Sequence, residues 1–376
     1  MKVKIKKEIF FENLKNAIAF TNKSHKIPTI SNVLIEASNG KLILTGTDLI
    51  TEGIIEINEC EILEEGYFLT NTTKLFNIIK LFSNEYIEFT SNNSKITLKD
   101  IEATYELLLL DSEEFTKFDF NKNELNKIKL KTKKFLKGIN ETIFSINPLN
   151  YRAYLTGINI RSINKNKIQF IGSDNYRISF STITIDDDNE IFNEIDIILP
   201  KKSAQHIKRL LTQYSEEFIE FYFNEKFFSI KINNTTINSK LIDEKYPDTT
   251  PILELEYPYS IKVHREKFLK ALKRASIFHS ETEGYTIIEI NENSLNIFSQ
   301  DSLYGKSFHK LEIEQSPKNF KIAINPKYIL DLEQILIGEN IILNLIDNEE
   351  KILITDELNK DFKYYVVPYQ TIEEEE

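Results

Sequence analysis

The chain has 376 residues, 41% hydrophobic and 28% charged, which is enough for two or three globular domains with apolar cores. Its formal net charge of −11 argues against crude electrostatic binding to nucleic acid or an anionic membrane, unless the basic residues are segregated. No apolar run approaches the roughly 18 residues of a membrane span, no signal region follows the charged N-terminus, and the single cysteine, Cys60, excludes an internal disulfide. We therefore expect a cytoplasmic protein with no membrane partner.

Six segments have helical spacing of apolar residues, and each follows a short extended run. In chain order, these segments cover 8–20, 69–82, 133–145, 199–211, 265–278 and 324–336. The helices at 199–211 and 324–336 each have a proline near the first helical position, Pro200 and Pro326. The order of strand, helix, strands, helix and strands therefore occurs three times.

Three polar turns between extended runs end in an aspartate: Gly46-Thr47-Asp48, Gly172-Ser173-Asp174 and Ser299-Gln300-Asp301. The aspartates are 126 residues apart (174 minus 48) and then 127 residues apart (301 minus 174). Because a catalytic loop rarely needs three copies, we interpret each as a turn in which the aspartate bonds its own backbone. The common spacing predicts three copies of one unit.

Basic residues are concentrated in the helical segments. Their excess is the number of Lys and Arg minus the number of Asp and Glu, taken over 8–26, 72–83, 133–145, 201–211, 265–278 and 326–336. The counts are +1, +2, +2, +4, +4 and −1, a total of +12, so the rest of the chain carries −23 (−11 minus 12). This segregation predicts a shared basic surface that binds a phosphate backbone without reading its sequence, although Asp331 and Glu333 in the last segment do not fit it.

The motifs of several enzyme classes are absent from the sequence. G-x-G-x-x-G, the P-loop pattern and G-x-S-x-G do not occur, and the five histidines lack metal-ligand spacing. No set of nucleophile, base and orienting residue stands out. We therefore expect no catalytic residues, no cofactor and no metal.

Six stretches resemble the family of the bacterial DNA sliding clamp, the beta subunit of DNA polymerase III. They are KIPTISNVLIEASNGKLILTGTDL at 26–49, YRAYLTGINI at 151–160, GSDNYRIS at 172–179, SKLIDEKYPD at 239–248, INPKYILDLEQIL at 324–336 and YYVVPYQ at 364–370. Their order and spacing extend the resemblance over essentially the whole chain. It implies an α+β fold of three similar tandem domains, which we place at 1–122, 123–253 and 254–376.

The resemblance also implies an assembly and a function. Two chains would join head to tail in a homodimeric ring, with helices lining the inside and sheets outside. The ring would encircle duplex DNA without sequence preference and act as a processivity factor without catalysis of its own. It would tether the DNA polymerase III catalytic subunit and other clients, and a separate ATP-driven clamp loader would open it.

A partner-binding pocket between the second and third domains is implied by the same resemblance. The matching residues are Leu155, Ser173, Tyr176, Arg177, Ile178, Pro247, Pro251, Ile252, Asn325, Tyr328, Tyr365, Val367, Pro368 and Tyr369. The chain departs from the family at Glu349, Glu350 and Lys351, where small or apolar residues are usual, and at Glu283, where an aromatic residue is frequent. It also continues to Glu373–Glu376 beyond the usual family terminus. These departures bear on which clients the pocket prefers.

For the ring interface, the resemblance indicates Tyr105 and Leu107 on an edge strand, which would meet Ile277 and Phe278 at the end of a helix. The implied DNA contacts are Lys23, Lys26, Arg152, Tyr154, Lys201, Lys202 and Arg209.

Two other functions remain open on the residues alone. One is a metal-dependent phosphoester hydrolase with Asp48, Asp174 and Asp301 as ligands, which would require carboxylates of successive domains to converge. The other is a monomeric repeat scaffold that binds only proteins.

Overall fold

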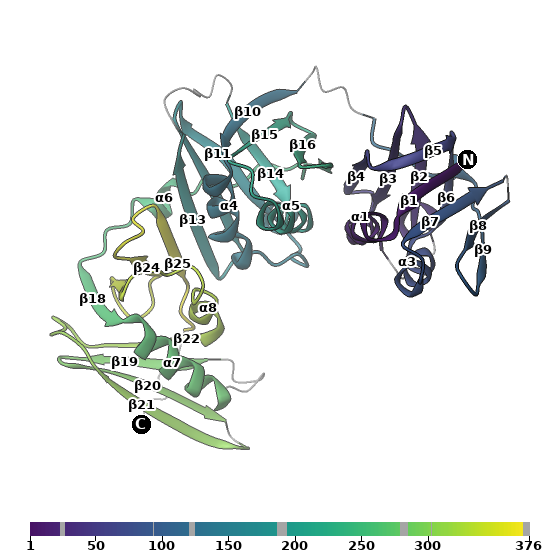
Figure 1. Ribbon diagram of the computed structural model, residues 1–376. Helices are drawn as coiled ribbons and strands as arrows, with labels where there is room; N and C mark the ends of the chain where they lie inside the picture. The colour runs from purple at the N-terminus through teal and green to yellow at the C-terminus, as the bar shows by residue number, and fades with distance from the viewer. Residues whose placement is uncertain are drawn as a thin grey trace. The chain divides into compact units, whose positions relative to one another are not determined.

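The computed structural model describes residues 1–22, 27–92, 94–119, 125–185, 194–278, 285–301 and 303–370 (Figure 1). The chain packs into two compact units. Unit 1 contains Met1–Lys133 and Leu199–Asp243, and unit 2 contains Lys134–Ile198 and Glu244–Glu376. No helix of the described residues is long and apolar enough to cross a membrane.

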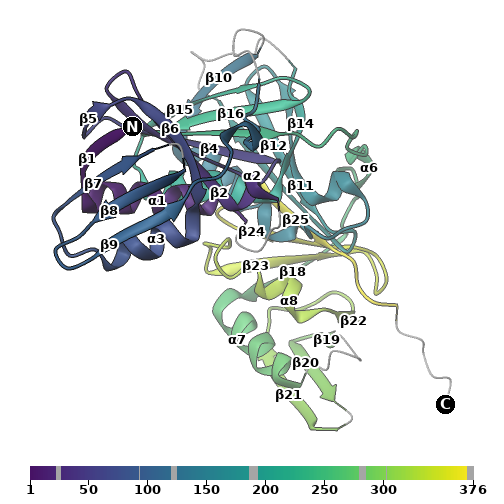
Figure 2. The ribbon, with the colours of Figure 1, turned by 90° about the vertical axis from the view of Figure 1, so that its right-hand side faces the viewer.

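Unit 1 contains a five-stranded and an eight-stranded sheet. The first has the order β5-β1-β7-β8-β9 and the second β10-β15-β16-β17-β4-β3-β2-β6. The strands of the first sheet are β1 (Lys2–Lys6), β5 (Cys60–Glu64), β7 (Tyr86–Ser91), β8 (Lys95–Lys99) and β9 (Thr104–Leu108). Those of the second are β2 (Asn32–Ser38), β3 (Lys41–Thr47), β4 (Thr51–Ile57), β6 (Gly66–Asn71), β10 (Asn126–Lys131), β15 (Phe218–Phe223), β16 (Phe227–Ile232) and β17 (Thr235–Lys240). Strands β7, β8 and β9 lie side by side in antiparallel register (Figure 2).

Unit 2 contains an eight-stranded sheet of order β14-β11-β12-β13-β25-β24-β23-β18 and a four-stranded sheet of order β21-β20-β19-β22. The strands of the first are β11 (Gly157–Asn164), β12 (Lys167–Ser173), β13 (Arg177–Thr184), β14 (Asp196–Pro200), β18 (Tyr259–His264), β23 (Asn340–Leu345), β24 (Ile352–Asp356) and β25 (Phe362–Val366). Those of the second are β19 (Thr286–Asn291), β20 (Ser294–Asp301), β21 (Gly305–Glu312) and β22 (Phe320–Ile324).

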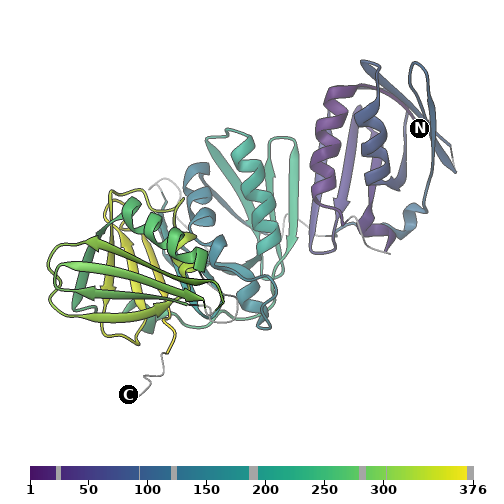
Figure 3. The same ribbon diagram turned by 90° about the horizontal axis from the view of Figure 1, so that it is seen from below.

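The long helices bury one apolar face each and follow the predicted segments, except that the helix predicted at 133–145 ends at Asn140 and a 3-10 turn, η3 (Ile143–Ser145), follows it. They are α1 (Lys7–Ala19), α3 (Thr72–Leu81), α4 (Thr132–Asn140), α5 (Lys201–Gln213) and α7 (Arg265–Ala275). In α7, Phe268, Leu272 and Ala275 are buried while Lys270 and Arg274 are exposed, as helical periodicity requires. Helices α1 and α3 pack against each other (Figure 3).

The last predicted helix, at 324–336, is shorter in the structure. Helix α8 covers only Pro326–Leu330, with Asn325 as its N-cap and its side chain accepting a bond from the Lys327 amide. Beyond it, the Leu332 and Glu333 amides bond carbonyls three residues back, so the segment continues as tight turns. The helical spacing of its apolar residues does not distinguish these two conformations.

Each third of the chain repeats one arrangement, which confirms the α+β fold and the threefold repetition. We call β1–β9 the first repeat, β10–β17 the second and β18–β25 the third. Each repeat supplies strands to two sheets, and both junctions between repeats are continuous antiparallel ladders. At the first, β17 pairs with β4, with Ser239 opposite Thr51. At the second, β25 pairs with β13, with Val366 opposite Arg177.

Candidate functional site

The three aspartate turns have the predicted local chemistry. The Asp48 carboxylate accepts bonds from the amides of Ile50 (3.0 Å) and Thr51 (2.7 Å). Asp174 and Asp301 make the same bonds to the amides two and three residues further on. Because each carboxylate caps its own turn, the proposed convergence of the three on one metal has no support in the geometry.

Two of these turns also bind the following repeat. The Lys202 ammonium of α5 lies 2.5 Å from the Asp48 carboxylate, so the turn of the first repeat holds a helix of the second. The turn of the second repeat holds the third through Arg177, whose guanidinium binds Asp174 (2.9 Å) and Asp331 (2.6 Å). Asp331, which did not fit the basic pattern of the helices, is thus the partner of a buried arginine.

Arg177 is buried, and its donors are used inside unit 2. Its Nη2 donates to the Phe144 carbonyl at 2.9 Å, and its guanidinium carbon lies 4.6 Å from the ring centroid of Tyr328. Burial lowers the pKa of Arg177, but Tyr364, Asp331 and Asp174 outweigh that effect and raise it above its ordinary value. Arg177 therefore holds Asp174, Asp331 and Phe144 together rather than offering a free anchor to a ligand. We call Arg177, Tyr328 and Tyr364 the floor of this region.

Tyr328 lies where several of the predicted pocket residues converge. Burial, with Asp174, Tyr369 and Tyr176 nearby, raises the pKa of its hydroxyl to about 12, while Arg177 opposes the shift. Its backbone carbonyl accepts a 2.9 Å bond from the Tyr364 hydroxyl. This bond joins helix α8 to strand β25.

Above this floor lies an exposed apolar surface that we call the tyrosine patch, consisting of Tyr176, Tyr285, Val367 and Tyr369. Tyr176 is 60% exposed and Tyr369 42% exposed. The Val367 amide bonds the Tyr176 carbonyl (2.8 Å), and the rings of Tyr285 and Tyr369 are 6.0 Å apart. Exposed aromatic side chains fixed by backbone bonds are typical of peptide-binding surfaces.

The other predicted pocket residues have mixed positions. Leu155, Ser173, Ile178, Tyr365 and Pro368 are buried, and Asn325 is half-buried at the start of α8. Pro247, Pro251 and Ile252 lie at and around α6 (Thr250–Leu253), a segment tied to β11 by a 2.9 Å bond from Arg161 to Thr249. Glu283 and Glu373–Glu376 lie outside the described residues. Tyr285, Phe144 and Asp331 were missed from the sequence, since no local pattern marks them.

The predicted DNA contacts differ in how far they reach solvent. Lys202 is exposed but paired with Asp48, and Lys201 is half-buried. Arg209 is half-buried, donates to the Asn16 side chain of α1 at 2.8 Å, and has its pKa lowered by burial. Lys23 and Lys26 lie outside the described residues.

In unit 2, Arg152 is exposed and Tyr154 is half-buried against the Tyr246 ring at 6.0 Å. The neighbours of Arg152 were missed from the sequence. Leu149 is 90% and Tyr151 81% exposed, and the Arg152 guanidinium lies 5.2 Å from the Tyr151 ring centroid. A cation stacked on an exposed aromatic ring suits contact with nucleic acid.

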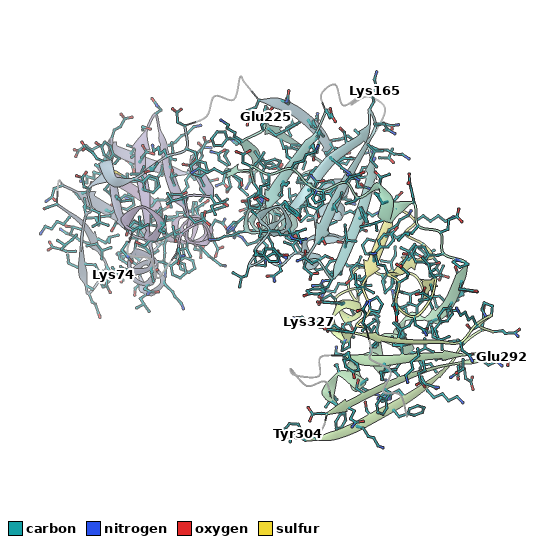
Figure 4. All side chains as sticks on the ribbon, turned by 180° about the vertical axis from the view of Figure 1, so that it is seen from behind. Lys74, Lys165, Glu225, Glu292, Tyr304 and Lys327 are labelled. Atoms are coloured by element: carbon teal, nitrogen blue, oxygen red, sulfur yellow. The ribbon has the colours of Figure 1, made fainter. Side chains whose placement is uncertain are left out.

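The predicted interface residues lie on or beside two edge strands. Tyr105 and Leu107 of β9 are half-buried against the core of the first repeat, and Ile277 is 75% exposed in η5 (Ser276–Phe278). Phe278 is half-buried beside Gly305 at the start of β21. Further exposed apolar residues are Leu108 on β9, Phe308 on β21, and Leu303 and Tyr304 at the tip of the β20–β21 hairpin (Figure 4).

Three profiles of one protein family match the chain in succession. They describe the N-terminal, central and C-terminal domains of the DNA polymerase III beta subunit and match residues 1–119, 129–248 and 253–370. Among curated relatives, the "Beta sliding clamp" of Mycoplasma capricolum is 23% identical and that of Buchnera aphidicola 26% identical. Each alignment covers 98% of this chain and 99% of the relative.

Solved structures of sliding clamps share the fold. The Caulobacter crescentus beta sliding clamp, with PEG bound to its putative beta-motif tethering region, has a TM-score of 0.92 at 19% identity. The Pseudomonas aeruginosa sliding clamp bound to griselimycin has a TM-score of 0.90 at 22% identity. Both alignments cover 99% of this chain and 100% of the solved chain.

Proposed function

Because the chain belongs to the family of the DNA polymerase III beta subunit, we propose that it acts as a DNA sliding clamp. It is a non-catalytic processivity factor: it encircles duplex DNA in the cytoplasm and tethers the DNA polymerase III catalytic subunit and other clients, and a clamp loader opens it.

The proposal of a ring rests on one observation, the way in which the strands of successive repeats pair. Strands β4, β13 and β21 each follow the aspartate turn of their repeat. At both internal junctions, the last strand of one repeat (β17, β25) pairs with the strand that follows the aspartate turn in the preceding repeat (β4, β13). Applied once more, the rule pairs β9 of one copy with β21 of another. These two strands are edges of their sheets, and edge strands carry unpaired backbone groups that pairing satisfies.

The aspartate turns support the same contact. The turn of the first repeat binds α5, and that of the second binds Asp331 just after α8. The third turn, which bears Asp301 and the exposed Tyr304, would by the same rule meet α3 of the other copy, where Lys74 is located (Figure 4). The contact is head to tail, because β9 and β21 belong to different repeats.

Each unit has its own proposed DNA contacts, and these cations do not read base sequence. In unit 1 they are Lys201 and Lys202, the second of which also pairs with Asp48. In unit 2, Arg152 supplies charge, and Tyr151 with Leu149 supplies an exposed apolar element beside it. Lysine and arginine contacts to phosphates depend on charge alone, which suits sliding. Arg209 contributes by positioning α5 against α1 through Asn16.

The client site is the tyrosine patch with the buried residues beneath it. It provides apolar contact area on a floor fixed by Arg177, Tyr328 and Tyr364. Short segments of client proteins would dock there, since a rigid apolar surface lowers the entropic cost of binding.

The first test is the mass in solution, by light scattering at micromolar and submicromolar concentration. A mass of about twice 44.0 kDa at both concentrations supports the ring. The protein is then loaded on nicked circular DNA with a clamp loader and the DNA is cut once. A ring is retained on the circle and released from the linear product. A monomeric mass, or equal retention before and after cutting, contradicts encirclement, and a monomer favours a repeat scaffold.

A further inference from the structure

The tyrosine patch lies at one end of the eight-stranded sheet of unit 2, and the strand register identifies which loops share that end. Tyr259 at the start of β18 pairs with Leu345 at the end of β23. Ile352 at the start of β24 pairs with Val366 at the end of β25, and Val366 also pairs with Arg177. The segments 254–258, 346–351 and 367–369 therefore all leave the sheet at the same end as the patch.

Side-chain contacts confirm that these segments are close. The rings of Tyr257 and Tyr365 are 6.3 Å apart, which brings the segment before β18 up to β25. Burial, together with Tyr365 and Glu350 nearby, raises the pKa of the Tyr257 hydroxyl well above its ordinary value. Tyr257 thus lies between the loop that follows β23 and Tyr365 of β25, one of the buried residues of the predicted pocket.

The two loops bordering the patch are acidic. Glu254, Glu256 and Glu349 are exposed, and over the described parts of the chain none of them has a cation within salt-bridge distance. Asp347 is used differently, because its carboxylate caps the amides of Glu349 and Glu350. We call Glu254, Glu256 and Glu349 the carboxylate rim.

Three cations beside these two loops have partners within the chain. The Lys351 ammonium lies 4.0 Å from Glu350, and the Lys321 ammonium 4.0 Å from Glu289. The Lys318 ammonium lies over the rings of Tyr259 and Phe320 at 5.6 Å. The carboxylate rim therefore has no cation partner among these three. Other parts of the border carry Lys327, beside Tyr328, and Arg152, which donates to Asn175 next to Tyr176 at 3.1 Å.

We propose that the client site of this chain selects linear peptides in which an apolar and aromatic core is flanked by lysine or arginine. This proposal rests on the proposed function, because it specifies which peptides the tyrosine patch accepts. The core would contact Val367 and Tyr369, and the flanking cations would meet the carboxylate rim. Opposite charges at a border favour the matching partner and repel acidic ones.

Two synthetic peptides test this selection by fluorescence anisotropy on the full chain. They share one core of leucine and phenylalanine, flanked by two lysines at each end in one peptide and by two glutamines in the other. At about 50 mM salt, three exposed ion pairs should favour the lysine peptide about fivefold. At about 0.5 M salt, screening should remove most of that preference.

A triple variant, Glu254→Gln with Glu256→Gln and Glu349→Gln, should lower the preference below about twofold while leaving the affinity for the glutamine peptide unchanged. The matched control, Glu59→Gln with Glu61→Gln and Glu225→Gln, removes the same charge from unit 1 and should keep the preference (Figure 4). Equal binding of both peptides to the wild-type chain overturns the proposal, as does an unchanged preference in the triple variant.

Val367→Asp separates this outcome from failure of the client site itself. Val367 is exposed, so the chain should fold, and both peptides should lose binding. If both peptides bind Val367→Asp as well as wild type, or if neither binds wild type, the tyrosine patch is not the client site. The proposed site is then wrong, and the selection rule fails with it.

Discussion

Ile277 offers the most direct test of the proposed contact between copies. It ends α7 in a short 3-10 turn and is 75% exposed, so it contributes little to the fold of its own chain. Ile277→Ala removes three carbons, each worth about 0.8 kcal/mol when buried. With three-quarters of the side chain available for burial, the loss is about 2 kcal/mol at each contact.

A two-subunit ring has two equivalent contacts, so one substitution acts twice. The free energy of dimerisation should weaken by about 4 kcal/mol, which raises the dissociation constant about a thousandfold. Sedimentation equilibrium from nanomolar to micromolar concentration measures this change. The melting temperature of the chain at concentrations where wild type is monomeric should stay the same.

Ile337→Ala is the matched control, because it makes the same chemical change at a site that is 62% exposed on another loop of the same unit. It should leave the dissociation constant within about twofold of wild type. If Ile277→Ala also leaves it there, Ile277 is not in the interface, and the reasoning from its exposure fails.

Burial, with Arg209 and Lys202 nearby, lowers the pKa of His206 from 6.5 to about 4, so the unfolded chain binds the proton first as the pH falls. The contribution of neutral His206 to the free energy of unfolding is therefore complete above about pH 6.5 and is lost towards pH 4. The loss should be about 2 kcal/mol at pH 5. Urea unfolding at the two pH values should show this loss in wild type and not in His206→Leu. Arg177→Met leaves Asp174 and Asp331 unpaired and should cost about 3 kcal/mol in urea unfolding, part of which Asp331→Asn restores; no recovery would contradict the pairing. Gly172→Ala would place a Cβ 2.2 Å from the Thr142 carbonyl oxygen and should lower the free energy of unfolding by about 1–3 kcal/mol. An unchanged free energy of unfolding in urea would show that the backbone moves to accept the methyl group. Arg152→Ala and Lys201→Ala should each reduce the slope of log affinity for DNA against log salt by about one; an unchanged slope would remove that residue from the phosphate contacts.

Local patterns predicted the elements of the fold because their causes are local. The stripe Phe268, Leu272 and Ala275 needs only helical spacing, and the Asp48 turn needs only its own backbone. The repeat spacing then predicted the architecture, since equal elements in equal order fold alike. The early end of α8 at Leu330 was not predictable, because the tight turns that follow it bury Leu332 and Leu336 as a helix would.

The client site was predictable only in part, because its floor is made by distant residues. Arg177 binds Asp331, which is 154 positions away in the sequence, and the Phe144 carbonyl. A sequence pattern cannot distinguish an arginine that is exposed as an anchor from one that is buried between two carboxylates. Tyr285 joins the patch through its contact with Tyr369, which again depends on tertiary structure.

The junction rule determines the kind of contact between copies but not their number. Each junction joins the last strand of one repeat to the strand after the aspartate turn of the preceding repeat. Because three repeats form only two junctions, one last strand, β9, and one strand after a turn, β21, each keep a free edge. These two edges are complementary rather than alike. A head-to-tail contact of this kind either closes into a ring or continues as a filament. Mutations at the contact weaken both assemblies equally, so they cannot separate these outcomes. Mass against concentration can, because a ring keeps one mass over a wide range whereas a filament grows.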